Sequence, residues 1–84
     1  MATVRTPIDS SVFLEVSTAA DAIVQNAGVS LVTVIFSGSL PAATEEGHPL
    51  SRGEAIQKIG GKPAGNIYVR MIDDGKSGTV AVSE

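Results

Sequence analysis

His48 is the only histidine in this 84-residue chain, and it follows Glu45 and Glu46 in one segment. A carboxylate can orient an imidazole for acid–base chemistry, and the two groups together can bind zinc. Both activities need rigid geometry, whereas the neighbouring Gly47 and Pro49 predict a loop. We therefore expect a solvated loop that contacts a partner, with no catalytic site and no metal site at His48.

Two fragments near the C-terminus resemble ligand-binding motifs. Gly75-Lys76-Ser77 matches the end of a phosphate-binding loop, but Arg70 stands where that motif needs its first glycine, and no helix is predicted to follow. Asp73 and Asp74 could begin a calcium loop, yet the alternating oxygen ligands and the closing glutamate are missing. These fragments favour a hairpin turn over a cofactor site.

The residue types that most nucleophilic and metal chemistry uses are scarce. The chain has no cysteine, which excludes disulfides, thiolate zinc sites and cysteine nucleophiles, and one histidine cannot form a multi-histidine metal cage. No Gly-x-Ser-x-Gly segment is present to hold a nucleophilic serine. We predict that the protein is not an enzyme and that it binds no cofactor.

Composition sets the class of protein. A chain of 84 residues with 43% apolar and 18% charged residues is one globular domain. The net charge of −3 leaves no basic stripe for nucleic acid, and no apolar run approaches a membrane span or a signal peptide, so we expect cytoplasmic synthesis. A domain this small without disulfide or metal usually needs association to be stable. We therefore expect an oligomer or a docked component.

Short apolar runs rich in Val and Ile predict an all-β domain. We expect a small antiparallel β-sandwich or barrel of about six strands over residues 11–84, preceded by an extended N-terminal arm over residues 1–10. A helix over Ala19–Gln25 is the alternative for the second strand. The expected strands cover residues 11–17, 22–26, 30–37, 54–59, 65–73 and 79–83.

Alternation within these runs predicts which side chains face the core. In the first strand, Val12, Leu14 and Val16 are expected inward, with Phe13 and Glu15 on the other face. The segment 30–37 is apolar on both faces, so it is either a central strand or a strand whose outer face a partner covers.

The last two predicted strands are expected to form a hairpin. Asp73–Gly78 supplies the turn residues, and the chain would return with Val80 and Val82 inward.

Three regions are candidate contact surfaces. The arm is one, and the long loop from Leu40 to Gly53 is the second, since loops of this length tend to be functional. The third is formed by the few aromatic residues, which belong either to the core or to an interface, together with Arg70, which shares a strand face with Tyr68. The candidate interface residues are Val4, Arg5, Pro7, Ile8, Phe13, Phe36, Leu40, Pro41, His48, Tyr68 and Arg70.

The order of several motifs resembles that of small virion proteins of tailed phages. The turn Val24-Gln25-Asn26-Ala27-Gly28 is followed by a hydrophobic strand and then by a loop that runs from Leu40-Pro41 to Gly53-Glu54. The chain ends in Gly65-Asn66-Ile67-Tyr68-Val69-Arg70 and Gly78-Thr79-Val80-Ala81-Val82-Ser83-Glu84, which resemble the closing strands of such proteins. The motifs are structural, and the resemblance spans Ser11 to Glu84.

This resemblance implies a capsid decoration or cement protein that binds the outer capsid surface and stabilises the shell. Its implied partners are the major capsid protein and other copies of the chain, most simply as a trimer, and its implied location is the virion surface. The alternatives are a tail, fibre or head-completion component and a small carbohydrate-binding receptor module.

Overall fold

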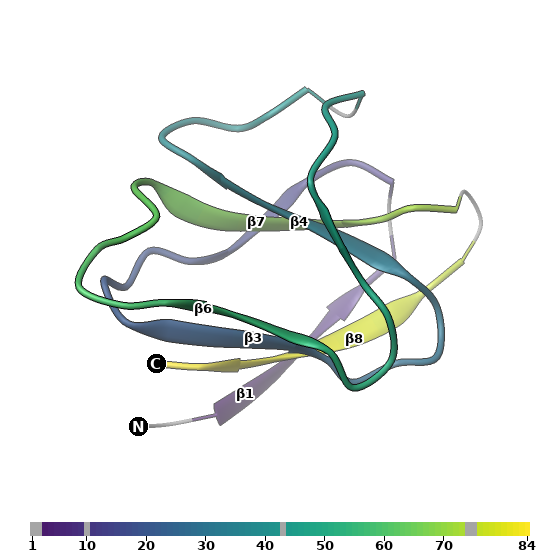
Figure 1. The fold of residues 1–84 in the computed structure, drawn as a ribbon. Helices are drawn as coiled ribbons and strands as arrows, with labels where there is room; N and C mark the ends of the chain where they lie inside the picture. Colours follow the sequence, from purple (N-terminus) through teal and green to yellow (C-terminus); the bar gives the residue numbers. More distant parts are fainter. Residues whose placement is uncertain (1–2, 10, 43, 74–75) are drawn as a thin grey trace.

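The computed structural model describes residues 3–9, 11–42, 44–73 and 76–84, which form a two-layered β-sandwich (Figure 1). The first sheet has the strand order β1-β8-β3-β6 and the second has the order β2-β7-β4-β5, and all neighbouring strands are antiparallel. The predicted all-β antiparallel fold is confirmed. The strands are β1 (Thr3–Ile8), β2 (Leu14–Ser17), β3 (Ala22–Asn26), β4 (Val32–Ser37), β5 (His48–Leu50), β6 (Ala55–Lys58), β7 (Asn66–Met71) and β8 (Gly78–Ser83).

The core lies between the two sheets and is built by the alternation of side chains along each strand. Val80 and Val82 of β8 point inward as predicted, and they join the inward residues of the second sheet. Full burial of one such side chain contributes roughly 1.5–3 kcal/mol relative to exposure. The core cluster consists of Ile8, Ala22, Val24, Val32, Val34, Leu50, Ile67, Val69, Met71, Val80 and Val82.

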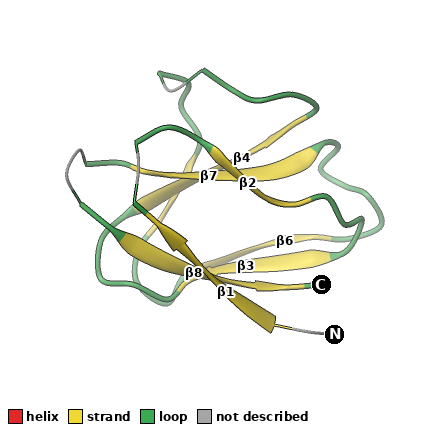
Figure 2. Ribbon diagram, turned by 180° about the vertical axis from the view of Figure 1, so that it is seen from behind, coloured by secondary structure: helices red, strands yellow, loops and turns green. Residues whose placement is uncertain are grey.

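The segment expected as an N-terminal arm is extended, but residues 3–8 belong to the sandwich. Thr3–Ile8 forms β1 and pairs along its whole length with β8 (Figure 2). Ile8 is buried in the core, which ties the end of this strand to the domain. β1 and the short β5, which lies inside the predicted long loop, raise the number of strands in the described residues to eight, where six or so were expected.

The predicted hairpin between β7 and β8 is wrong. β7 lies in the second sheet between β2 and β4, whereas β8 lies in the first sheet between β1 and β3. Both edges of β7 are therefore occupied, and the intervening segment carries the chain from one sheet to the other. Part of the predicted turn, residues 74 and 75, lies outside the described residues.

Burial along the first predicted strand differs from the expectation at three positions. Phe13 is only 4% exposed, whereas Val12 and Leu14 are 53% and 46% exposed. The strand itself is shorter than predicted, and its pairing with β7 shifts between Glu15 and Ser17. Leu14 lies opposite the core residue Val69, so it faces inward as predicted, and it is exposed because β2 is an edge strand.

β4 is a central strand of the second sheet, between β7 and β5. Val32 and Val34 on its inner face are fully buried, as is Thr33 on its outer face, which is 3% exposed. Of the two alternatives for this segment, the central strand is the one observed.

Candidate interaction surfaces

One edge strand of each sheet lies on the same side of the sandwich. β1 and β2 are edge strands, and Val4 and Thr6 of β1 line a cavity of about 270 Å³ together with Val16 of β2. Val82 and Glu84 complete its lining. We call this side of the molecule, Thr3–Ile8 and Val12–Ser17, the β1–β2 edge.

The β1–β2 edge exposes aliphatic side chains. Val4 is 61% exposed although it lies on the face of β1 that carries the core residue Ile8, and Val12 and Leu14 are about half exposed. A second cavity of about 210 Å³ is lined by these two residues together with Ile8, Asp9 and Phe13. Clustered apolar exposure next to polar residues is typical of interaction surfaces.

Hydrogen bonds between β3 and β8 fix the direction of the backbone groups in β1. Successive residues of an antiparallel strand direct their N–H and C=O groups alternately to the two sides. The amide of Ala27 donates to the carbonyl of Thr79 (2.9 Å), so Thr79 faces β3, and Val80 and Val82 face β1. Their partners in β1 are Thr6 and Val4.

The backbone groups of Thr3, Arg5 and Pro7 therefore point to the free side of β1. Pro7 has no N–H to donate, and in this position no ladder hydrogen bond is lost. The free side of β1 thus offers the N–H groups of Thr3 and Arg5 and the carbonyls of all three residues.

Pro49 in the edge strand β5 is placed in the same way. The amide of Ile72 donates to the carbonyl of Leu31 (3.4 Å), which directs the backbone groups of Leu31 and Thr33 toward β7. Pro49 lies opposite Thr33, so its ring nitrogen faces away from the sheet. Both strand prolines occupy positions where an edge tolerates them.

Tyr68 and Arg70 share one face of β7, as predicted. This is the outer face of the second sheet, and Tyr68 is only 5% exposed there. Its hydroxyl donates to Glu15 Oε2 (3.0 Å), and Asn66 Nδ2 donates to the same oxygen (3.2 Å). Burial and the adjacent Glu15 carboxylate raise the pKa of Tyr68 above its ordinary value. This network ties β2 to β7 across the outer face.

Arg70 holds the long loop against the same face. Its guanidinium carbon lies 5.2 Å from the centroid of the Phe13 ring, a cation–π distance. Nη1 donates to the carbonyl of Met71 (3.0 Å) and Nη2 to the carbonyl of Glu45 (3.4 Å) in the loop. The buried Nε has no hydrogen-bond partner among the described residues.

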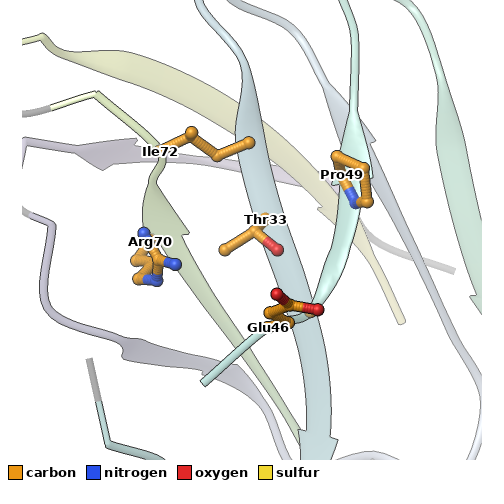
Figure 3. Close-up of a pocket in the computed structure, with 6 residues that line it drawn as sticks. Thr33, Glu46, Pro49, Arg70 and Ile72 are labelled. Carbon is orange, nitrogen blue, oxygen red and sulfur yellow. The ribbon is translucent and has the colours of Figure 1, made fainter. Parts of the chain in front are cut away.

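A cavity of about 300 Å³ lies where this loop meets the second sheet (Figure 3). Thr33 lies in its floor between Arg70 on β7 and Pro49 on β5, and Glu46 extends from the loop. Gly47 permits the close approach of the loop, because a Cβ there would lie 2.6 Å from Thr33 Oγ1. The cavity combines a cation, a carboxylate and a hydroxyl.

His48 is exposed on β5, and no group of three metal-ligating side chains occurs in the described ranges. Glu54 is an acidic residue near His48 whose pKa is shifted. Its Oε1 accepts a hydrogen bond from the amide of Ser51 (2.6 Å), which lowers the pKa of Glu54, with a smaller contribution from His48. This arrangement closes the turn between β5 and β6. Gly75 and Asp74 of the motifs considered above lie outside the described residues.

Lys58 is a buried charged residue that the sequence did not single out. Its ammonium donates to the carbonyl of Gly65, linking β6 to the segment before β7. Neither composition nor spacing predicts that this lysine is buried, because its burial follows from the position of β6 in the first sheet.

The predicted interface residues fall into three groups by burial. Ile8, Phe13, Pro41 and Tyr68 are buried, and Phe36 and Arg70 are half-buried. The structure brings Phe13 and Arg70 together and leaves Leu40 apart from them, at 61% exposure. Val12 and Leu14 join Val4 on the exposed edge, although the sequence pattern predicts that both are buried. The exposed members are Val4, Arg5, Pro7, Leu40 and His48.

Comparison of the chain with protein-family models, with curated proteins and with solved structures finds no match in any of the three. Within the described residues there is no helix that could cross a membrane.

Proposed function

We propose that this domain is a non-enzymatic virion structural protein of the capsid decoration type. In this proposal it binds the outer surface of the shell, with the major capsid protein and other copies of itself as partners, and it acts as a trimer. The observation that supports an assembly role is the β1–β2 edge, where the side chains of Val4, Val12 and Leu14 are all exposed. The motif order that resembles tailed-phage virion proteins supports the location.

Each contact of so small a domain is weak, and the role therefore depends on repetition. Burial of apolar surface contributes about 25 cal/mol per Å², so a few valine and leucine side chains give only a few kcal/mol per copy. When copies are joined to each other, binding of one copy to the shell raises the effective concentration of the others at their sites. The affinity of the whole assembly then exceeds that of one copy. A small protein can in this way restrain the joints between shell subunits.

Cosedimentation with capsid shells that lack decoration tests this proposal. The wild-type chain should pellet with the shells, and Leu14→Glu should reduce binding at least tenfold, since it places a charge in the exposed aliphatic group. Val29→Glu is the matched control, because Val29 is 77% exposed and lies in the turn between β3 and β4. Failure of the wild-type chain to bind shells, or equal loss in both variants, would contradict the proposal.

A small ligand-binding module is the second candidate, and the cavity under the long loop favours it. Arg70, Glu46 and Thr33 present charged and hydroxyl groups there, which suit a polar ligand such as a carbohydrate. Saturation-transfer NMR with a set of simple sugars would detect this activity, and Glu46→Gln should abolish the transfer. A tail or head-completion component would instead be recognised by a copy number near a dozen per particle.

A further inference from the structure

The free edge of β1 has hydrogen-bonding groups that no residue of the described chain uses. Thr3 and Arg5 direct their N–H and C=O groups away from β8, and Pro7 directs only a carbonyl. An unpaired strand edge of this kind is a template for another extended strand. The composition of β1 determines which strand fits.

A second copy of β1 can pair with it antiparallel about a two-fold axis. We compare three registers of this pairing by their charges and their hydrogen bonds. Centred on Arg5, the register places two like charges directly opposite each other, which is destabilising. Centred on Thr6, it pairs Arg5 with Pro7 of the other copy and loses one hydrogen bond in each pair. Centred on Val4, it pairs Thr3 with Arg5, and both residues have a donor and an acceptor.

We propose that two copies of this chain associate through β1 in the register centred on Val4. Thr3 of each copy exchanges both main-chain hydrogen bonds with Arg5 of the other, and the two Arg5 side chains take diagonal positions about 7–8 Å apart. The two Val4 side chains lie opposite each other, where side chains of a non-hydrogen-bonded pair approach most closely.

The exposure of Val4 agrees with this pairing. Val4 lies on the core-facing side of β1 and lines the 270 Å³ cavity between the sheets, yet it is 61% exposed in the single chain. Val4 of a second copy would cover it and extend the apolar inner face of the first sheet. Because the interface is two-fold, one partner occupies each β1 edge, and association through β1 stops at two copies.

The inference deepens the proposed function and rests on it only for its biological role. If the chain also forms the proposed trimer through another surface, the β1 pairing joins two trimers. If it does not, the product is a dimer of the 8.6 kDa chain. In both cases, blocking β1 halves the mass of the assembly.

The test uses light scattering of the purified full chain over a range of concentrations. Arg5→Pro removes the outward N–H and keeps the ladder to β8, so it should halve the limiting mass or raise the dissociation constant at least tenfold. Arg5→Thr is the matched control, since it removes the same charge and keeps the N–H, and it should associate as the wild type does. Hydrogen exchange of the Arg5 amide should slow with concentration in the wild type.

Folding of the variants is checked by thermal melting. Arg5→Pro should melt within a few degrees of the wild type, whereas Thr6→Pro should melt much lower because the Thr6 N–H faces β8. Equal association of Arg5→Pro and Arg5→Thr, or a wild-type chain that stays monomeric, would overturn the proposal. If the wild-type chain is a monomer and only Arg5→Pro loses binding to shells, the edge of β1 binds a segment of the shell and not a second copy. If the chain is a monomer and only Leu14→Glu loses binding to shells, the proposed function holds and the β1 pairing does not.

Discussion

The side-chain amide of Asn26, at the end of β3 in the first sheet, donates a hydrogen bond to the carbonyl of Leu50, at the end of β5 in the second (2.9 Å). The same amide donates to Ser30 (2.9 Å), and its carbonyl oxygen accepts from the amide of Gly28 (2.9 Å). Asn26 is almost fully buried, and its bond to the carbonyl of Leu50 forms away from water. One polar side chain thus links the two sheets and shapes the turn between β3 and β4.

Replacing Asn26 should therefore be costly. Asn26→Leu leaves the carbonyls of Leu50 and Ser30 without this donor, and we expect a loss of about 2–3 kcal/mol in the free energy of unfolding. Urea denaturation measures this difference. The neighbouring Gln25 is the control, since its amide bonds to Gly53 at an exposed site and Gln25→Ala should cost less than about 1 kcal/mol. Similar costs at both positions would contradict the role given to Asn26.

The core and the exposed edge should respond differently to the same truncation. Val69 is fully buried in β7, and Val69→Ala should destabilise the domain by about 2 kcal/mol through lost burial and a residual cavity. Val4→Ala should change the stability of the isolated chain by no more than about 0.5 kcal/mol, because Val4 is mostly exposed. Thermal or urea unfolding at low protein concentration, where association does not contribute, compares the two.

Stability at high pH should depend on Tyr68. Burial and the Glu15 carboxylate raise the pKa of Tyr68 in the folded protein, while a tyrosine in the unfolded chain has a pKa of about 10. The folded state holds the phenolic proton more tightly, so this contribution is complete below about pH 10 and is lost as the pH rises through the folded pKa. Urea midpoints between pH 8 and pH 12 should fall more steeply in the wild type than in Tyr68→Phe. Parallel curves would show that Tyr68 does not contribute.

Gly65 should not tolerate a side chain. It has a φ of 101°, and a Cβ there would lie 2.6 Å from the carbonyl carbon of Ser37 at the end of β4. Gly65→Ala should lower the melting temperature by several degrees, as expected for a loss of about 1–3 kcal/mol in a domain of this size. Gly38→Ala is the matched control, since nothing lies within 4 Å of its added Cβ, and it should melt close to the wild type.

Local patterns in the sequence predicted the strands better than their partners. The prediction for β3 has the same bounds as the observed strand, and the inward positions of Val80 and Val82 are confirmed. These features depend on neighbouring residues alone. The pairing of β7 with β2 and β4 depends on residues far apart in the chain, and for this reason the turn residues at Asp73–Gly78 suggested a hairpin that does not form.

The exposed edge was only partly predictable for a related reason. Val4 and Arg5 were singled out as contact residues, although in an arm rather than a strand. Leu14 faces inward as alternation predicts, but alternation cannot reveal that its strand lies at a sheet edge, where an inward side chain stays exposed. The cavity between Arg70 and Glu46 depends on the path of the long loop, which no local pattern encodes.

The alternation of the chain between the sheets also bears on how the protein folds. Among the strands of the described ranges, only β4 and β5 are both consecutive in the sequence and paired. Each other ladder there joins strands that are separated along the chain. Closing such long loops costs conformational entropy before the contacts between the strands stabilise the structure. Domains of this kind therefore fold in milliseconds to seconds rather than microseconds. β1 and β8 pair with each other although about 70 residues separate them, so the first sheet cannot be completed until both segments are available to pair.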